Sequence, residues 1–273
     1  MPTPVLYESH MHTPLCKHAT GEPEEYAAVA EQRGLKGIIV TCHNPDNNGW
    51  SPGVRMSVDE FDEYVSIVER ARQEWEGRVD VRLGLESDYA PGMEPWLEEL
   101  HSMAELHHVL GSVHPHLAEY RDRYMCDDIF DYQKIYYEHL AMAAETGLFD
   151  TIAHPDLVKN VFPDDWDLAR LMDHIRSCLD RIAKVGAAVE LNTSGANKTI
   201  SEMNPGREIL DEILKRDIPM VLGADAHQPD RVGDAFGMGL DLLKETGFTH
   251  VSIFLNRERK DIEIGEARNS LKE

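Results

Sequence analysis

Short apolar runs alternate with longer amphipathic stretches along the whole chain. The apolar runs are rich in β-branched residues and predict strands at 5–9, 37–41, 79–85, 109–113, 149–153, 187–192, 220–224 and 249–255. The amphipathic stretches predict helices at 22–33, 57–75, 128–145, 165–185, 208–215 and 232–245. Glycines that directly follow several helical stretches act as C-terminal stops.

Strands that alternate with helices over a whole chain favour an α/β fold with a parallel sheet and crossover helices. The number of predicted strands favours a closed barrel over an open sheet, and 273 residues suit one such barrel. The active site of a barrel lies at the carboxyl ends of its strands. The residues that follow each apolar run are therefore the candidates for function.

The composition is that of a globular protein, with 42% hydrophobic and 28% charged residues. No apolar run approaches the roughly 20 residues that span a bilayer, and the N-terminus lacks the basic and apolar regions of a signal peptide. The four cysteines show no C-x-x-C pairing, which indicates reduced thiols. These features predict a cytoplasmic protein with no membrane partner. They give no indication of an oligomeric state.

The chain is strongly acidic, with a formal net charge of −23. Such a charge disfavours binding to nucleic acid, which requires a basic surface. It also repels anionic substrates at long range. A phosphate substrate would therefore need a local positive site, which bound divalent ions would supply.

Side chains of the kinds that bind metals end or follow most of the predicted strands. His10 and His12 are two residues apart, so in a strand both point to the same face, and Asp225 and His227 repeat this spacing. A barrel would bring nine such side chains to one mouth: His10, His12, His18, His43, Glu86, His114, His154, Asp225 and His227. Because nine ligands exceed the needs of one ion, we predict a cluster of two or three. Mixed imidazole and carboxylate ligands favour Zn, Mn or Fe over Ca or Mg.

The other histidines and the cysteines receive simpler interpretations. A lone histidine at a strand end is more often hydrogen-bonded than metal-bound, and we expect His139 on a helix surface. His116 is a candidate to support a ligand. Cys16 and Cys42 lie near the predicted mouth, so one of them is a candidate to approach the metals.

The ordered set of motifs resembles that of the PHP (polymerase and histidinol phosphatase) family. The motifs are Glu8-Ser9-His10-Met11-His12-Thr13, Thr41-Cys42-His43, Gly84-Leu85-Glu86, Gly111-Ser112-Val113-His114, Ala153-His154-Pro155-Asp156 and Gly223-Ala224-Asp225-Ala226-His227. Residues 192–195 and the helix after the last motif resemble the histidinol-phosphatase branch. The resemblance implies a distorted (β/α)7 TIM-like barrel, a single domain over residues 1–273, and a trinuclear metal centre held by the nine residues named above.

The resemblance also implies hydrolysis of a small phosphate monoester, most simply histidinol phosphate in histidine biosynthesis. Asp225 and His227 are the catalytic candidates, because either could help to protonate the leaving alkoxide. Lys159 and Lys198 are the candidates for binding substrate phosphate, since that branch commonly has arginines in their neighbourhoods. Lysine binds phosphate as a point charge, without the fork of arginine. Arg207 and Lys17 are weaker candidates for the same role.

Two positions depart from the family pattern. Glu8 stands where an aspartate is common, and we expect it to orient a ligand imidazole. Cys42 replaces the aspartate of a Thr-Asp-His motif. The metal motifs are shared across the superfamily, so a nucleotide, a sugar phosphate, a phosphodiester and phosphotyrosine are alternative substrates. A non-catalytic, metal-stabilised module is a further alternative, which the lack of a polymerase or basic domain disfavours.

Overall fold

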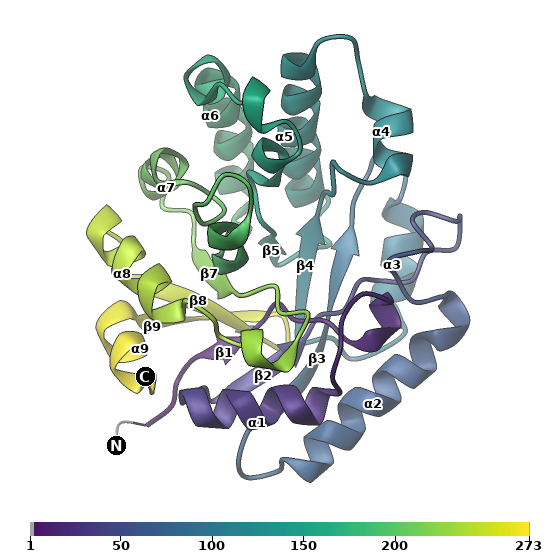
Figure 1. The fold of residues 1–273 in the computed structure, drawn as a ribbon, viewed down its shortest axis with the longest axis vertical. Helices are drawn as coiled ribbons and strands as arrows, with labels where there is room; N and C mark the ends of the chain where they lie inside the picture. Colours follow the sequence, from purple (N-terminus) through teal and green to yellow (C-terminus); the bar gives the residue numbers. More distant parts are fainter. Residues whose placement is uncertain (1–2, 273) are drawn as a thin grey trace.

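The computed structural model describes residues 3–272, and its centre is one nine-stranded sheet whose strand order follows the sequence (Figure 1). The first eight strands are parallel and the ninth is antiparallel to the eighth. The strands are β1 (Tyr7–Glu8), β2 (Gly37–Val40), β3 (Asp80–Asp88), β4 (His108–Ser112), β5 (Thr151–Ile152), β6 (Ala188–Asn192), β7 (Met220–Gly223), β8 (His250–Leu255) and β9 (Glu258–Glu263).

The sheet closes into a barrel just beyond the carboxyl ends of β1 and β7. The Ala226 N–H donates to the His10 carbonyl at 2.9 Å, and the His12 N–H donates to the Ala226 carbonyl at 2.9 Å. At the other end β8 continues the sheet past β7, and Tyr7 of β1 shares a buried cluster with Ile253 of β8. The seven strands β1–β7 therefore form a distorted (β/α)7 barrel, and the predicted fold class is confirmed.

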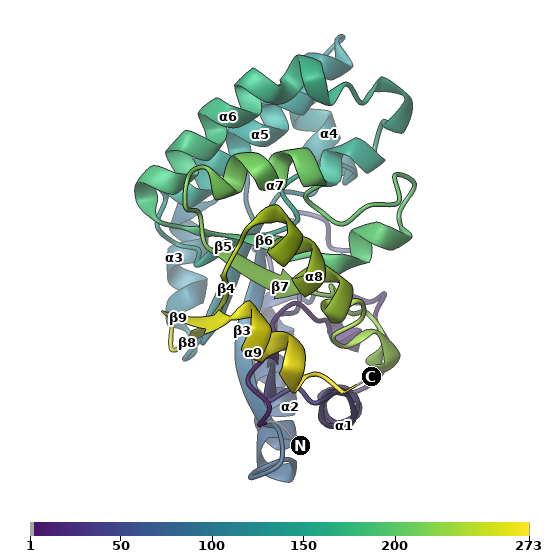
Figure 2. The same cartoon turned by 90° about the vertical axis from the view of Figure 1, so that its left-hand side faces the viewer.

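Helices cover the outside of this sheet (Figures 1 and 2). They are α1 (Pro23–Arg33), α2 (Phe61–Glu74), α3 (Glu94–Ser102), α4 (Ala118–Tyr124), α5 (Ile129–Glu145), α6 (Leu168–Val185), α7 (Arg207–Leu214), α8 (Phe236–Thr246) and α9 (Ile264–Ser270). Their sequences explain their limits. For example, α1 has proline in its first turn and a capping box between Glu22 and Glu25, and it ends at Gly34 with a φ of 75°.

The amphipathic pattern also decides which helix face is buried. In α6 the buried residues include Leu171, Ile175, Leu179 and Ile182, whose three- and four-residue spacing forms one apolar stripe. Each strand and helix predicted from the pattern is present, with ends that differ by a few residues. No helix within residues 3–272 is long and apolar enough to cross a membrane.

One predicted environment is wrong. His139 is buried in α5 rather than exposed, with its side chain 6% accessible. Its Nδ1 lies 2.8 Å from the Tyr120 hydroxyl, which satisfies the ring in the interior. Burial lowers the pKa of His139 to about 4, so the ring is neutral at pH 7.

Candidate metal centre

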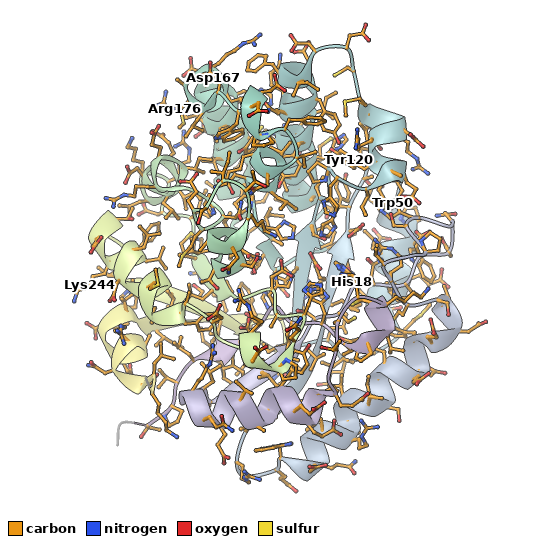
Figure 3. All side chains as sticks on the ribbon, in the orientation of Figure 1. His18, Trp50, Tyr120, Asp167, Arg176 and Lys244 are labelled. Carbon is orange, nitrogen blue, oxygen red and sulfur yellow. The ribbon has the colours of Figure 1, made fainter. Side chains whose placement is uncertain are left out.

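The structure brings all nine predicted ligands together at the carboxyl end of the barrel. They come from the loops that follow β1, β2, β4, β5 and β7, and from the end of β3. The innermost of them, such as His10 and Glu86, are buried, whereas His18 and His227 are on the open side. Figure 3 shows His18 near the middle of the molecule, while Arg176 and Lys244 lie on outer helices.

Glu86 is the centre of this cluster. His43 Nδ1 lies 2.8 Å from its Oε2, and His10 Nε2 lies 3.4 Å from the same oxygen. On the other side, His154 Nε2 and His114 Nε2 lie 3.0 and 3.2 Å from Oε1. His12 Nε2 also lies 3.6 Å from Oε2, so one carboxylate faces five imidazoles, three on Oε2 and two on Oε1. This is the arrangement of a carboxylate that can bridge two ions.

Asp225 occupies the equivalent place on the opposite side of the barrel mouth. Its Oδ1 lies 3.2 Å from His12 Nε2, 3.6 Å from His10 Nε2 and 3.5 Å from His227 Nδ1. Asp225 has a φ of 51° and His154 a φ of 28°, which is left-handed backbone that non-glycine residues seldom adopt. Such strain persists at functional sites where the surroundings hold it.

Several donor and acceptor atoms in the cluster are buried and make no hydrogen bond of proper geometry within the described part of the chain, although some of them lie close to one another. They are His10 Nε2, His12 Nδ1 and Nε2, His43 Nδ1, Glu86 Oε2 and His154 Nδ1. Buried polar atoms are normally satisfied, so this concentration needs an explanation. Ligand atoms in the triplets His10–His12–Glu86 and His43–Glu86–His114 lie within 4.8 Å of one another. The residues therefore fit divalent metal ions.

Glu190, which the sequence analysis did not single out, supports two of these residues from β6. Its Oε1 lies 2.6 Å from His10 Nδ1, and its Oε2 accepts the backbone N–H of His154 at 2.8 Å. Because a carboxylate only accepts, it keeps the proton on Nδ1 of His10 and turns the lone pair of Nε2 toward the cluster. The signal in the sequence was a charged residue inside the apolar run 187–192.

Asp88 performs the same task for His114. Its Oδ1 lies 2.7 Å from His114 Nδ1, and its Oδ2 accepts from Arg55 Nη2 at 2.5 Å and from Trp50 Nε1 at 2.8 Å. Burial alone would lower the pKa of His114, but Asp88 and Glu86 outweigh it and raise the pKa to about 10. Asp88 lies two residues after Glu86 on the same face of β3, so this spacing could have identified Asp88 from the sequence.

Arg55 is the third residue that the sequence analysis missed. Its side chain is only 2% exposed, and Nη1 donates to both the backbone carbonyl and the Oδ1 of Asn44, at 2.8 and 2.9 Å. Its Nε is buried and has no hydrogen-bond partner within residues 3–272, and the residue lines the cavity beside the cluster. It lies in an irregular segment, where no periodic pattern marks it.

The two lysines predicted to bind phosphate lie in different places. Lys198 lines the cavity beside the cluster. Lys159 is fully buried elsewhere, and its Nζ donates to Asp156 Oδ2 at 2.8 Å and to Glu202 Oε1 at 2.9 Å. Its ammonium is therefore already neutralised by two carboxylates, and it is absent from the lining of that cavity.

Glu8 and the two weaker phosphate candidates have structural partners instead. The Glu8 carboxylate accepts the backbone N–H of His10, Ala224 and Gly233 at 3.0, 3.0 and 2.7 Å, so the expectation that it orients an imidazole is wrong. Burial raises the pKa of Glu8 to about 7. Lys17 donates to the Pro52 carbonyl, and Arg207 pairs with an aspartate on its own helix.

A cavity of about 330 Å³ opens above the cluster. Besides His18, His43, His114, His154, Asp225 and His227, its walls include Val54, Arg55, His116, Leu117, Leu157 and Lys198. This volume suits a small molecule. A larger hollow of about 460 Å³ is lined by residues 36, 72–73 and 76–82, away from the predicted ligands.

Comparisons with known proteins agree with this geometry. The family model described as the PHP domain matches residues 8–194. A probable histidinol-phosphatase of Deinococcus radiodurans is 38% identical over 89% of this chain and 94% of its own length. The histidinol-phosphatase of Bacillus subtilis is 25% identical over 84% of this chain and 96% of its own length.

A solved structure shares the fold. The histidinol phosphate phosphatase of Lactococcus lactis, solved in complex with zinc, L-histidinol and phosphate, has a TM-score of 0.80 at 18% identity. The similarity covers 93% of this chain and 98% of the other. The family predicted from the motifs is confirmed, and this chain belongs to the PHP domain family.

Proposed function

We propose that this protein is a metal-dependent phosphatase that hydrolyses histidinol phosphate. The observation that carries the proposal is the convergence of nine metal-type side chains, six of which line one cavity of about 330 Å³. The substrate is suggested by the relatives: the Deinococcus and Bacillus proteins are named histidinol-phosphatases, and the Lactococcus enzyme was solved with L-histidinol and phosphate. We further propose that residues 1–273 form one catalytic domain, which acts in the cytoplasm.

The proposed ligands are the nine residues of the cluster, and they would bind two or three divalent ions of Zn, Mn or Fe. When bound, such ions neutralise phosphate oxygens and lower the pKa of a coordinated water toward neutrality. Glu86 lies between five imidazoles and would be a ligand shared within the cluster. Glu190 and Asp88 hold the rings of His10 and His114 by their Nδ1 atoms.

The cavity walls supply the remaining functions. The cavity wall includes one lysine, Lys198, and one arginine, Arg55, and we assign Lys198 to the substrate phosphate because Arg55 is already held by Asp88 and Asn44. Asp225 and His227, whose side chains are 14% and 28% exposed, are the candidates to pass a proton to the leaving alkoxide. The net charge of −23 attracts the protonated amine of histidinol phosphate even though it repels the phosphate.

A substrate panel tests the proposal. The metal-loaded enzyme should turn over histidinol phosphate with a far higher kcat/KM than p-nitrophenyl phosphate, a nucleotide, a sugar phosphate, a phosphodiester or phosphotyrosine. If histidinol phosphate is hydrolysed no better than p-nitrophenyl phosphate, the substrate assignment fails.

Variants test the metal centre itself. His10→Ala and Asp225→Ala should each lose bound metal and activity, measured by elemental analysis and phosphate release. His250→Ala is the matched control, because His250 is an exposed histidine at the start of β8. Full metal content and full activity in both site variants would overturn the proposal.

A further inference from the structure

Two histidines of the cluster face each other in an unusual way. His18 Nε2 and His227 Nε2 are 2.9 Å apart. The opposite nitrogen of each ring lies near a backbone carbonyl: His18 Nδ1 is 2.7 Å from the Cys16 carbonyl, and His227 Nδ1 is 3.0 Å from the Asp225 carbonyl. A carbonyl only accepts, so each Nδ1 carries the proton and each Nε2 presents a lone pair.

Two lone pairs at this distance repel each other, and a shared cation would relieve the repulsion. The Cys16 sulfur completes the group, because it and one nitrogen each of His18 and His227 lie within 4.8 Å of one another. In a tetrahedral zinc site, neighbouring nitrogen and sulfur ligands are separated by about 3.3–3.6 Å. The two Nε2 atoms are slightly closer than this, and the sulfur lies within 4.8 Å of a nitrogen of each ring, so a small shift would place the three ligand atoms around one ion.

The local fold fixes the position of Cys16. It ends a short 3-10 helix (Pro14–Cys16), after which Lys17 turns the chain with a φ of 70° and so places His18 beside it. The Cys16 side chain is fully buried. The sulfur of Cys16 also lies within 4.8 Å of a nitrogen of His12, a buried ring with no hydrogen-bond partner on either nitrogen among the described residues.

Cys42 is nearby but already engaged. Its sulfur accepts hydrogen bonds from the Thr13 hydroxyl at 3.2 Å and from the Thr13 N–H at 3.4 Å. These bonds hold Cys42 against the loop that follows β1. Of the two buried cysteines beside the cluster, Cys16 is therefore the one that a metal ion next to His18 and His227 can recruit.

We propose that the Cys16 thiolate is a metal ligand together with His18 and His227, so that one position of the centre contains sulfur. This proposal rests on the metal centre of the proposed function and adds a tenth ligand to it. On binding, the thiol proton is released to solvent and the sulfur lone pair is donated to the ion. Thiolate ligands favour zinc or cobalt over manganese or magnesium, so this position should select zinc.

Cobalt spectroscopy tests the proposal without using activity. The full-length enzyme loaded with Co²⁺ should show a near-ultraviolet thiolate-to-cobalt charge-transfer band. Cys16→Ser should lose this band while visible d–d bands show that cobalt is still bound. Cys42→Ser should keep it, as should Cys126→Ser, which removes a cysteine from the segment between α4 and α5. A band that survives in Cys16→Ser, or that disappears in Cys42→Ser, would overturn the assignment.

A second measurement needs no variant and covers the case in which Cys16→Ser does not fold. X-ray absorption at the zinc edge of the wild-type zinc enzyme should contain sulfur scattering at about 2.3 Å, beyond the nitrogen shell at about 2.0–2.1 Å. A shell without sulfur overturns the thiolate ligand alone. If the wild-type protein binds neither cobalt nor zinc, the proposed metal centre fails as well, so the two failures are distinguishable.

Discussion

Exchanging Glu190 for glutamine changes one atom and should disturb the metal centre through His10. The carboxylate accepts from His10 Nδ1 at 2.6 Å on one side, and from the His154 N–H at 2.8 Å and Asn192 Nδ2 at 3.1 Å on the other. All three partners are donors toward Glu190. An amide has one accepting and one donating end, so Glu190→Gln must place a donor against a donor.

The two orientations of the new amide have different costs. If its nitrogen faces His154, a buried backbone N–H is left unsatisfied, which costs about 1–3 kcal/mol of unfolding free energy. If its nitrogen faces His10, the ring must move its proton to Nε2, the atom that faces Glu86 and Asp225. Losing such an outer partner typically weakens metal binding by about 10–100-fold, which corresponds to about 1.4–2.8 kcal/mol.

The measurement is metal affinity by competition with a chelator, combined with kcat/KM at limiting and at excess metal. Glu190→Gln should bind metal about 10–100-fold more weakly, and excess metal should restore much of its activity. Glu208→Gln, an exposed exchange of the same kind on α7, should match the wild type. Wild-type affinity in Glu190→Gln, with unchanged stability, would refute the role assigned to this carboxylate.

Three further changes test other parts of the structure. The methyl group of Gly223→Ala would overlap Glu190 Oε1 and lie 2.7 Å from His10 Cβ, so elemental analysis should find less bound metal; wild-type metal content would contradict this. Lys159→Met leaves the buried Asp156 carboxylate without its ammonium partner, so the free energy of unfolding in urea should fall by about 3–5 kcal/mol. A loss of substrate affinity without a loss of stability would instead place Lys159 at the substrate. Burial lowers the pKa of His108 to about 3, against about 6.5 in the unfolded chain. The unfolded state therefore binds more protons below pH 6.5, and stability should fall by about 2 kcal/mol on going to pH 5. His108→Asn should lack this contribution when the free energy of unfolding in urea is measured against pH. A pH dependence equal to that of the wild type would refute the role of His108.

The barrel was predictable because its strands are buried on both faces. Runs such as Gly37–Val40 and Met220–Gly223 are apolar throughout. Amphipathic stretches with helical periodicity separate these runs along the sequence. The ligands were predictable for the same reason, since a parallel barrel must bring its strand ends together. By contrast, β9 has a polar sequence, largely exposed, and is a strand only because it pairs with β8.

The supporting residues were harder to predict because their roles depend on partners far along the chain. Glu190 acts on His10, from which it is separated by 180 positions. Arg55 acquires its role from Asn44 and Asp88, and its own segment has no regular pattern. Lys159 lies near a predicted ligand in sequence, but its ammonium is directed to Asp156 and Glu202. Sequence spacing predicted which part of the fold each of these residues occupies, but not where its side chain points.

The pairing of Met11 with Ala226 has a consequence for the synthesis of the protein. Three of the nine proposed ligands, His10, His12 and His18, follow β1 and are translated long before Asp225 and His227, which follow β7. A nascent chain therefore exposes an incomplete set of imidazoles for most of its translation. Ions that it captures early would be held by fewer ligands and would exchange readily. The full set of proposed ligands is therefore assembled only when the segment after β7 pairs with the loop after β1.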